Sequence, residues 1–133
     1  MPADVLPPDD PEEWLRYAES DLIVAAQSAG PGVLPATLCF HAQQAAEKCL
    51  KAVLIRHGVA FPYTHSVSAL IDLVVGAGIA WPTGLDDAAT LTDYAVAARY
   101  PSAHEAVDEE ERARAVALAR RVLEWATAMV AGG

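Results

Sequence analysis

The sequence predicts an all-α fold, an up-and-down antiparallel helical bundle of four to five helices. The composition supports this prediction, because alanine, leucine and glutamate are abundant and aromatic residues, which favour strands, make up 7%. Apolar residues recur at helical spacing between glycines and prolines, and short connections favour antiparallel neighbours. The length of 133 residues suits a single domain, expected at residues 10–133 after a flexible tail at residues 1–9.

The first helix is expected to begin after Asp10, which is a good N-cap residue, with Pro11 at the first helical position. It should end near Gln27 or Ser28, because a Gly-Pro-Gly sequence follows at residues 30–32. The apolar side of this helix is formed by Trp14, Ala18, Leu22 and Ala25.

The second helix is expected at residues 35–57, with Gly58 at its C-cap. Ser66 is the expected N-cap of a third helix at residues 67–75, and Gly76 and Gly78 should end it.

A fourth helix is expected from residue 85 to Arg99, because Tyr100 precedes a proline and residues before proline avoid helical dihedrals. Asp108 then begins a capping box with acidic residues at 109–111, where the positive end of the helix dipole lies. The apolar side expected for this last helix is Ala113, Val116, Ala117, Leu123, Ala126 and Val130.

Charge and hydropathy exclude several classes of protein. The net charge of −9 argues against a general nucleic-acid binder, because phosphate contacts need clustered lysine and arginine, and no DNA binding is expected. No apolar run reaches the roughly 18 residues of a membrane helix, and the N-terminus lacks the pattern of a secretory signal. A cytoplasmic protein without membrane contact is therefore expected.

The cysteines and three of the histidines favour structural roles. Cys39 and Cys49 are ten residues apart, about 15 Å along a helix, which is too far for a disulfide, so both are expected to be reduced core residues. His57 suits a helix C-terminus, and His65 is expected to help cap the third helix, with a role in a site as the alternative. His41 is expected at the helix surface or a dimer seam, with ligand contact as the alternative.

A stripe of polar side chains follows the second helix at spacings of three and four residues. It contains Gln43, Gln44, Glu47, Lys48 and Lys51. An apolar stripe beside it contains Phe40, Ala46, Leu50, Val53 and Leu54. Amides and paired charges beside an apolar seam indicate a face that meets a ligand or partner. The alternative for Glu47 and Lys51 is surface support of the helix, worth about 0.2–0.5 kcal/mol.

Four blocks of the sequence together resemble the HEPN domain family. They are WLRYAESDL at residues 14–22, FHAQQAAEKCLK at 40–51, THS at 64–66 and YAVAARYP at 94–101. The blocks stand in the family's order and spacing, and the resemblance covers about residues 11–130. It implies a helical bundle that forms a homodimer and acts with a minimal nucleotidyltransferase in a toxin–antitoxin-type pair. Within such a module, the polar stripe and Tyr100 are the candidate residues for binding a nucleotide or partner, and no cofactor is expected.

The nuclease-active branches of that family share an Arg-x(4–6)-His motif, and this chain contains Arg99-Tyr-Pro-Ser-Ala-His104. A histidine could accept the proton of a ribose 2′-hydroxyl, and an arginine could hold the scissile phosphate. The alternative function is therefore a metal-independent endoribonuclease with Arg99 and His104 as catalytic residues at a dimer interface. The structural alternative is that Arg99 complements a helix C-terminus and His104 lies in an exposed loop after Pro101.

Overall fold

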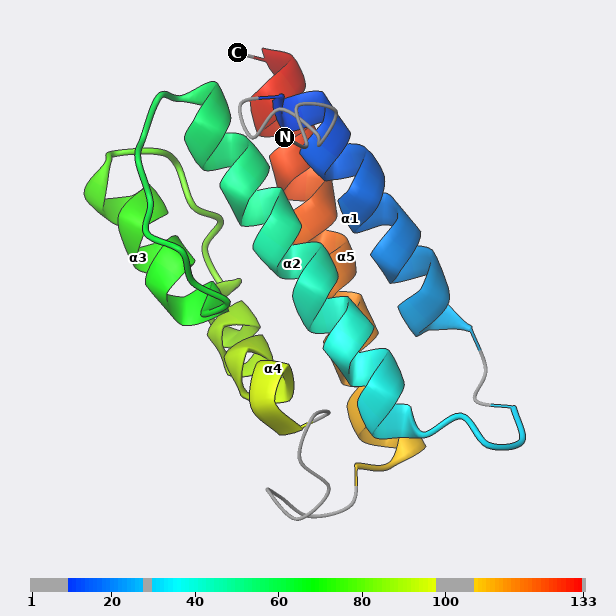
Figure 1. Ribbon diagram of the computed structural model, residues 1–133. Helices are drawn as coiled ribbons and strands as arrows, with labels where there is room; N and C mark the ends of the chain where they lie inside the picture. Colours follow the sequence, from blue (N-terminus) through cyan, green and yellow to red (C-terminus); the bar gives the residue numbers. More distant parts are fainter. Residues whose placement is uncertain (1–9, 28–29, 98–106, 133) are drawn as a thin grey trace.

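The computed structural model describes residues 10–27, 30–97 and 107–132, which form helices and their connections without any strand. The elements are α1 (Pro11–Ala26), α2 (Pro35–Arg56), α3 (Val67–Gly76), the 3-10 helix η1 (Asp86–Asp93), α4 (Tyr94–Ala97) and α5 (Glu109–Gly132). Helix α2 lies at the centre, with α1 and α5 packed against it and α3 on its other side (Figure 1). The predicted all-α bundle is confirmed, whereas the predicted tail at residues 1–9 lies outside the described residues. Within the described part, no helix is both long and apolar enough to cross a membrane.

The start of α1 follows the predicted capping pattern. The Asp10 carboxylate accepts hydrogen bonds from the backbone N–H groups of Glu12 and Glu13, at 3.1 and 3.3 Å. These bonds satisfy two of the donors that have no partner inside the helix. Further along α1, Ala18 and Ala25 are fully buried, which confirms the predicted apolar side.

We expect the substitution Asp10→Ala to lower the free energy of unfolding by about 1 kcal/mol, because it removes this cap. Urea denaturation followed by circular dichroism measures the change. Asp72→Ala is the matched control, since Asp72 is exposed within α3. Equal effects of the two substitutions would show that the cap contributes nothing specific.

Helices α2 and α3 end in the same glycine-dependent turn. After α2, the Val59 N–H donates to the Leu54 carbonyl at 2.8 Å and Gly58 has a φ of 70°. After α3, the Ile79 N–H donates to the Val74 carbonyl at 3.1 Å and Gly78 has a φ of 79°. Glycine adopts this left-handed conformation without a Cβ penalty. The predicted role of Gly58 in ending α2 is therefore confirmed, with Gly58 one residue after the C-cap His57. In α3, Gly76 is the last helical residue, and Gly78 is the glycine with the left-handed conformation.

The predicted fourth helix is only partly correct. The described part of that segment is a 3-10 helix, Asp86–Asp93, followed by the short α4, Tyr94–Ala97. Aspartate and threonine dominate the first segment, and both are weak helix formers that compete for backbone hydrogen bonds. Thr90 does so directly, donating its hydroxyl to the Asp87 carbonyl at 2.6 Å.

The last helix begins as predicted, and its predicted apolar side is correct at Val116, Ala126 and Val130 but not at every position. The Asp108 carboxylate accepts from the Glu111 N–H at 2.8 Å, which confirms the cap. Ala113 and Ala117, expected inside, are exposed, and Leu123 is half-buried. The buried residues of α5 are Ala115, Val116, Ala119, Val122, Ala126 and Val130. Alanine occurs on all sides of this helix, so it could not identify the buried side.

Both cysteines lie in the core of α2 as free, fully buried thiols, which confirms the expected core role. Burial raises the pKa of the Cys39 thiol to about 11, with the negative charge of Glu111 adding to the effect. Burial also raises the pKa of the Cys49 thiol. Both groups are therefore neutral thiols at physiological pH.

We expect both cysteines to stay unmodified when the folded protein is treated with a thiol-reactive disulfide at about pH 8. Only the thiolate reacts with such a reagent, and both thiols are protonated at this pH. Two thiols should react after denaturation in guanidinium chloride. The pKa of Cys39 is higher in the folded state than its ordinary value of 9.0. The protonated thiol therefore contributes fully to the free energy of unfolding below about pH 9.0, and this contribution is lost as the pH rises toward about 11. Rapid labelling of the folded chain at neutral pH would contradict the buried placement.

Candidate functional site

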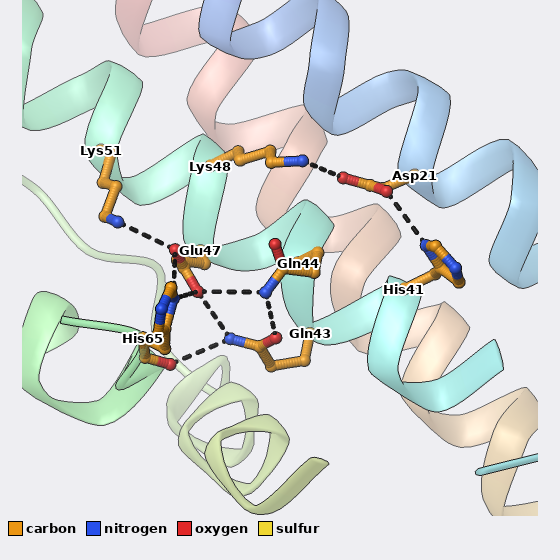
Figure 2. Close-up of polar contacts among 8 residues, drawn as sticks. All are labelled: Asp21, His41, Gln43, Gln44, Glu47, Lys48, Lys51 and His65. Carbon is orange, nitrogen blue, oxygen red and sulfur yellow. Dashed lines mark hydrogen bonds and ion pairs between the residues drawn. The ribbon is translucent and has the colours of Figure 1, made fainter. Parts of the chain in front are cut away.

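The polar stripe of α2 is the part of the predicted site that the structure describes. Arg99, Tyr100 and His104 lie outside the described residues, so the geometry of the Arg-x4-His motif remains a prediction. The stripe divides into two groups of interacting side chains (Figure 2). The Glu47 cluster comprises Gln43, Gln44, Glu47, Lys51 and His65, and the Asp21 cluster comprises Asp21, His41 and Lys48.

The Glu47 carboxylate is the centre of the first cluster. Its Oε2 accepts from the Lys51 Nζ at 2.8 Å, and its Oε1 accepts from the Gln43 Nε2 at 2.9 Å. Gln44 donates to the Gln43 Oε1 at 2.8 Å, so the amides form a chain of donors and acceptors. The buried polar side-chain atoms of the described residues all have partners, as a low-dielectric interior requires.

Burial corrects the interpretation of these side chains as an exposed face. Gln43 is 0% exposed, Glu47 3% and Lys51 6%. The Glu47–Lys51 pair is thus a buried ion pair and not surface support. These three side chains are covered by the rest of the chain, whereas Gln44 and Lys48 are the half-buried members of the stripe.

Aromatic rings cover the charged end of the cluster. The Lys51 Nζ lies 5.7 Å from the centre of the Trp14 ring and 5.8 Å from that of Phe61. These contacts bring α1 and the segment after α2 over the ammonium group, which gains cation–π attraction in place of water. The helical spacing of residues 47 and 51 forms the pair, and tertiary packing excludes solvent from it.

His65 joins the cluster from the segment before α3. Its Nδ1 lies 3.2 Å from both Glu47 oxygens, and its backbone carbonyl accepts from the Gln43 Nε2 at 2.9 Å. The expected capping role belongs instead to Ser66, whose Oγ accepts from the Ala69 N–H at 3.0 Å. His65 is thus a hydrogen-bond partner of Glu47, and its role in a site stays a prediction.

The Asp21 cluster connects α1 to α2. The Asp21 carboxylate accepts from the Lys48 Nζ at 2.5 Å and lies 3.1 Å from the His41 Nδ1. His41 is therefore a half-buried partner of a carboxylate between two helices. Asp21 could not be singled out from the sequence, because one acidic residue on a polar helix side carries no distinguishing pattern.

Comparison with known proteins decides the family. The HEPN domain model matches residues 11–129 of the chain. The chain belongs to the HEPN domain family. Its fold is similar to the crystal structure of TT1696 from Thermus thermophilus, with 32% identity, a TM-score of 0.77, and coverage of 90% of this chain and 97% of that one. It is also similar to ST0689, an archaeal HEPN homologue, with 26% identity, a TM-score of 0.71, and coverage of 91% and 98%. The comparison with curated proteins gave no match.

A second polar feature of this HEPN domain lies between η1, α4 and α5. The Tyr94 hydroxyl donates to the Glu111 carboxylate, and burial together with this bond raises the pKa of Tyr94. Both residues line a groove of about 310 Å³, together with Asp87, Thr90, Leu91, Arg114, Ala115 and Leu118. Tyr94 and Glu111 flank, in sequence, the segment that carries Arg99 and His104. The carboxylates of Asp87 and Glu111 in this groove disfavour a phosphate as its ligand.

Proposed function

We propose that this HEPN domain protein is a dimeric module that binds a nucleotide or partner protein and acts with a minimal nucleotidyltransferase in a toxin–antitoxin-type pair. The observation that carries the proposal is the family match over residues 11–129, which spans the whole bundle. The Glu47–Lys51 ion pair is buried away from solvent, so the binding surface of such a module lies outside these two side chains.

Large aromatic side chains are favoured at protein interfaces, but the three tryptophans of this chain contact other parts of the same chain. Trp81 and Trp125 pack edge to face with ring centres 4.8 Å apart, and the Trp125 Nε1 donates to the Ala80 carbonyl at 2.8 Å. Trp14 lies over Lys51. All three are therefore used within one chain, and support for a dimer must come from other surfaces.

A groove of about 390 Å³ between α1 and α5 offers such a surface to a second copy of the chain. Ile23, 58% exposed, lines it with Leu22 and Leu123. Glu19 and Arg120 also line it, and neither forms an ion pair with another described residue. Opposite charges on one patch make it self-complementary about a twofold axis, where Glu19 of each copy would face Arg120 of the other.

Light scattering tests the dimer, with an expected mass of twice 14.0 kDa at micromolar concentration. We expect Glu19→Arg and Arg120→Glu each to weaken the dimer, and the double variant to restore it. A monomeric wild type would contradict the dimer. Dimerisation unaffected by the single variants would place the interface elsewhere.

Titration of the dimer with ATP and with a minimal nucleotidyltransferase tests the binding role. If neither binds, the proposed binding role is refuted.

The endoribonuclease is the second candidate, and the spacing of Arg99 and His104 in the sequence supports it. The test is cleavage of RNA by the purified protein in the presence of EDTA. Arg99→Ala and His104→Ala should each abolish cleavage, whereas Arg120→Ala, measured at a concentration that keeps it dimeric, should not. Intact RNA with the wild type, or equal cleavage by all variants, would exclude this activity.

A further inference from the structure

The hydrogen bonds around Glu47 determine which nitrogen of His65 carries a proton. The other partners of the carboxylate are all donors, namely the Lys51 ammonium and the amide nitrogens of Gln43 and Gln44. Glu47 is therefore an acceptor on both oxygens. Since the His65 Nδ1 lies 3.2 Å from each of them, Nδ1 must be the protonated nitrogen.

This tautomer leaves a lone pair on the His65 Nε2. The His65 side chain is 36% exposed, and no described residue forms a hydrogen bond with Nε2. The backbone is also held, because the His65 carbonyl accepts from the fully buried Gln43. A buried carboxylate that orients a solvent-accessible imidazole is the arrangement by which proteins present a proton acceptor.

The pairing of His41 with Asp21 provides an internal comparison. The His41 side chain is 32% exposed and also faces a carboxylate, at 3.1 Å. However, the Asp21 side chain is 15% exposed and that of Glu47 only 4%. The interaction that orients His65 is thus better shielded from water and salt than the one that orients His41.

Tyr63 indicates the shape of a ligand that could donate a hydrogen bond to the His65 Nε2. Its side chain is exposed, at 91%, and its ring lies edge to face with His65 at 5.3 Å between centres. An exposed ring in edge-to-face contact with an imidazole that has a free acceptor suits a planar ligand with a hydroxyl or N–H donor. Among the described residues the nearby cation is Lys51, which is buried and paired with Glu47 and so offers no accessible positive charge to a phosphate.

We propose that His65 Nε2 is the hydrogen-bond acceptor of a site for an uncharged planar aromatic ligand that donates a hydroxyl or N–H hydrogen and packs against Tyr63. Glu47 is the positioning residue, and it acts by fixing the tautomer. The proposal is independent of Arg99 and His104 and of the nucleotidyltransferase partnership.

Nitrogen NMR of ¹⁵N-histidine-labelled protein tests the tautomer at about pH 8, where a free imidazole is neutral. The His65 Nε2 should have the shift of an unprotonated nitrogen, and Nδ1 that of a protonated one. In Glu47→Gln, with folding checked by circular dichroism, the signals should move toward the tautomer mixture of free imidazole, while those of His57 stay fixed. A protonated Nε2 in the wild type would overturn the proposal.

Binding is tested with phenol, which has a hydroxyl donor, and with anisole, which has the same ring but a methoxy group without a donor. Phenol should perturb the His65 and Tyr63 signals in a saturable manner, with an affinity about threefold to tenfold above that of anisole, the range of one net hydrogen bond. Tyr63→Ala, which alters an exposed side chain and leaves the fold intact, should weaken both ligands. Equal affinity for the two ligands, or the absence of saturable shifts, would refute the site.

Discussion

The substitution Glu47→Leu is expected to lower the free energy of unfolding by about 3–5 kcal/mol, because removing one partner of a buried ion pair leaves the other charge uncompensated. Lys51 is 6% exposed and has Glu47 as its ion-pair partner. Gln43 would also lose an acceptor inside the core, which adds the desolvation of an unpaired donor. Urea denaturation followed by circular dichroism measures the loss.

The double variant Glu47→Leu with Lys51→Met separates the charge from the packing. With no ammonium left in the interior, much of the stability should return, since a buried ion pair is often replaceable by apolar side chains of similar volume. Glu13→Ala is the control, because it breaks the exposed ion pair with Arg16 and should have little effect. If the double variant is no more stable than Glu47→Leu alone, the unpaired charge is not the cause of the loss.

The helices were predictable wherever a backbone requirement selects one residue type. Asp10 and Ser66 cap helices as expected, because short polar side chains reach the free N–H groups of a first turn. Gly58 adopts a positive φ at the predicted end of α2 for an equally local reason. By contrast, the 3-10 geometry of η1 was missed, because its apolar spacing resembles that of an α-helix and its weak helix formers decide the outcome.

The polar stripe shows what the sequence leaves out of a candidate site. The spacing of Glu47 and Lys51 correctly predicted a pair on one side of the helix. The pair is buried because Phe61 and Trp14 cover it. The Glu47 cluster also includes His65, which is eighteen residues from Glu47 in the chain. A helical pattern describes one helix, so it cannot state which segments cover it. The same limit applied to Asp21, whose partners lie on another helix.

Leu50→Ala is expected to lower the free energy of unfolding by about 2–5 kcal/mol, since it removes a fully buried side chain and leaves a cavity. Leu50 lies on α2, which packs against α1, α3 and α5, so this cavity would open in the core that these helices share. Leu50→Met, which conserves volume, should cost less than about 1.5 kcal/mol. Thermal and urea unfolding measure both.

Leu34→Ala provides the comparison outside the core. Leu34 precedes α2 and is 64% exposed, so its truncation should change the free energy of unfolding by less than about 0.5 kcal/mol. The same chemical change at two positions thus separates burial from helix propensity, which alanine improves slightly at an internal position such as Leu50. A small effect at Leu50, comparable to that at Leu34, would contradict the central position of α2 in the bundle.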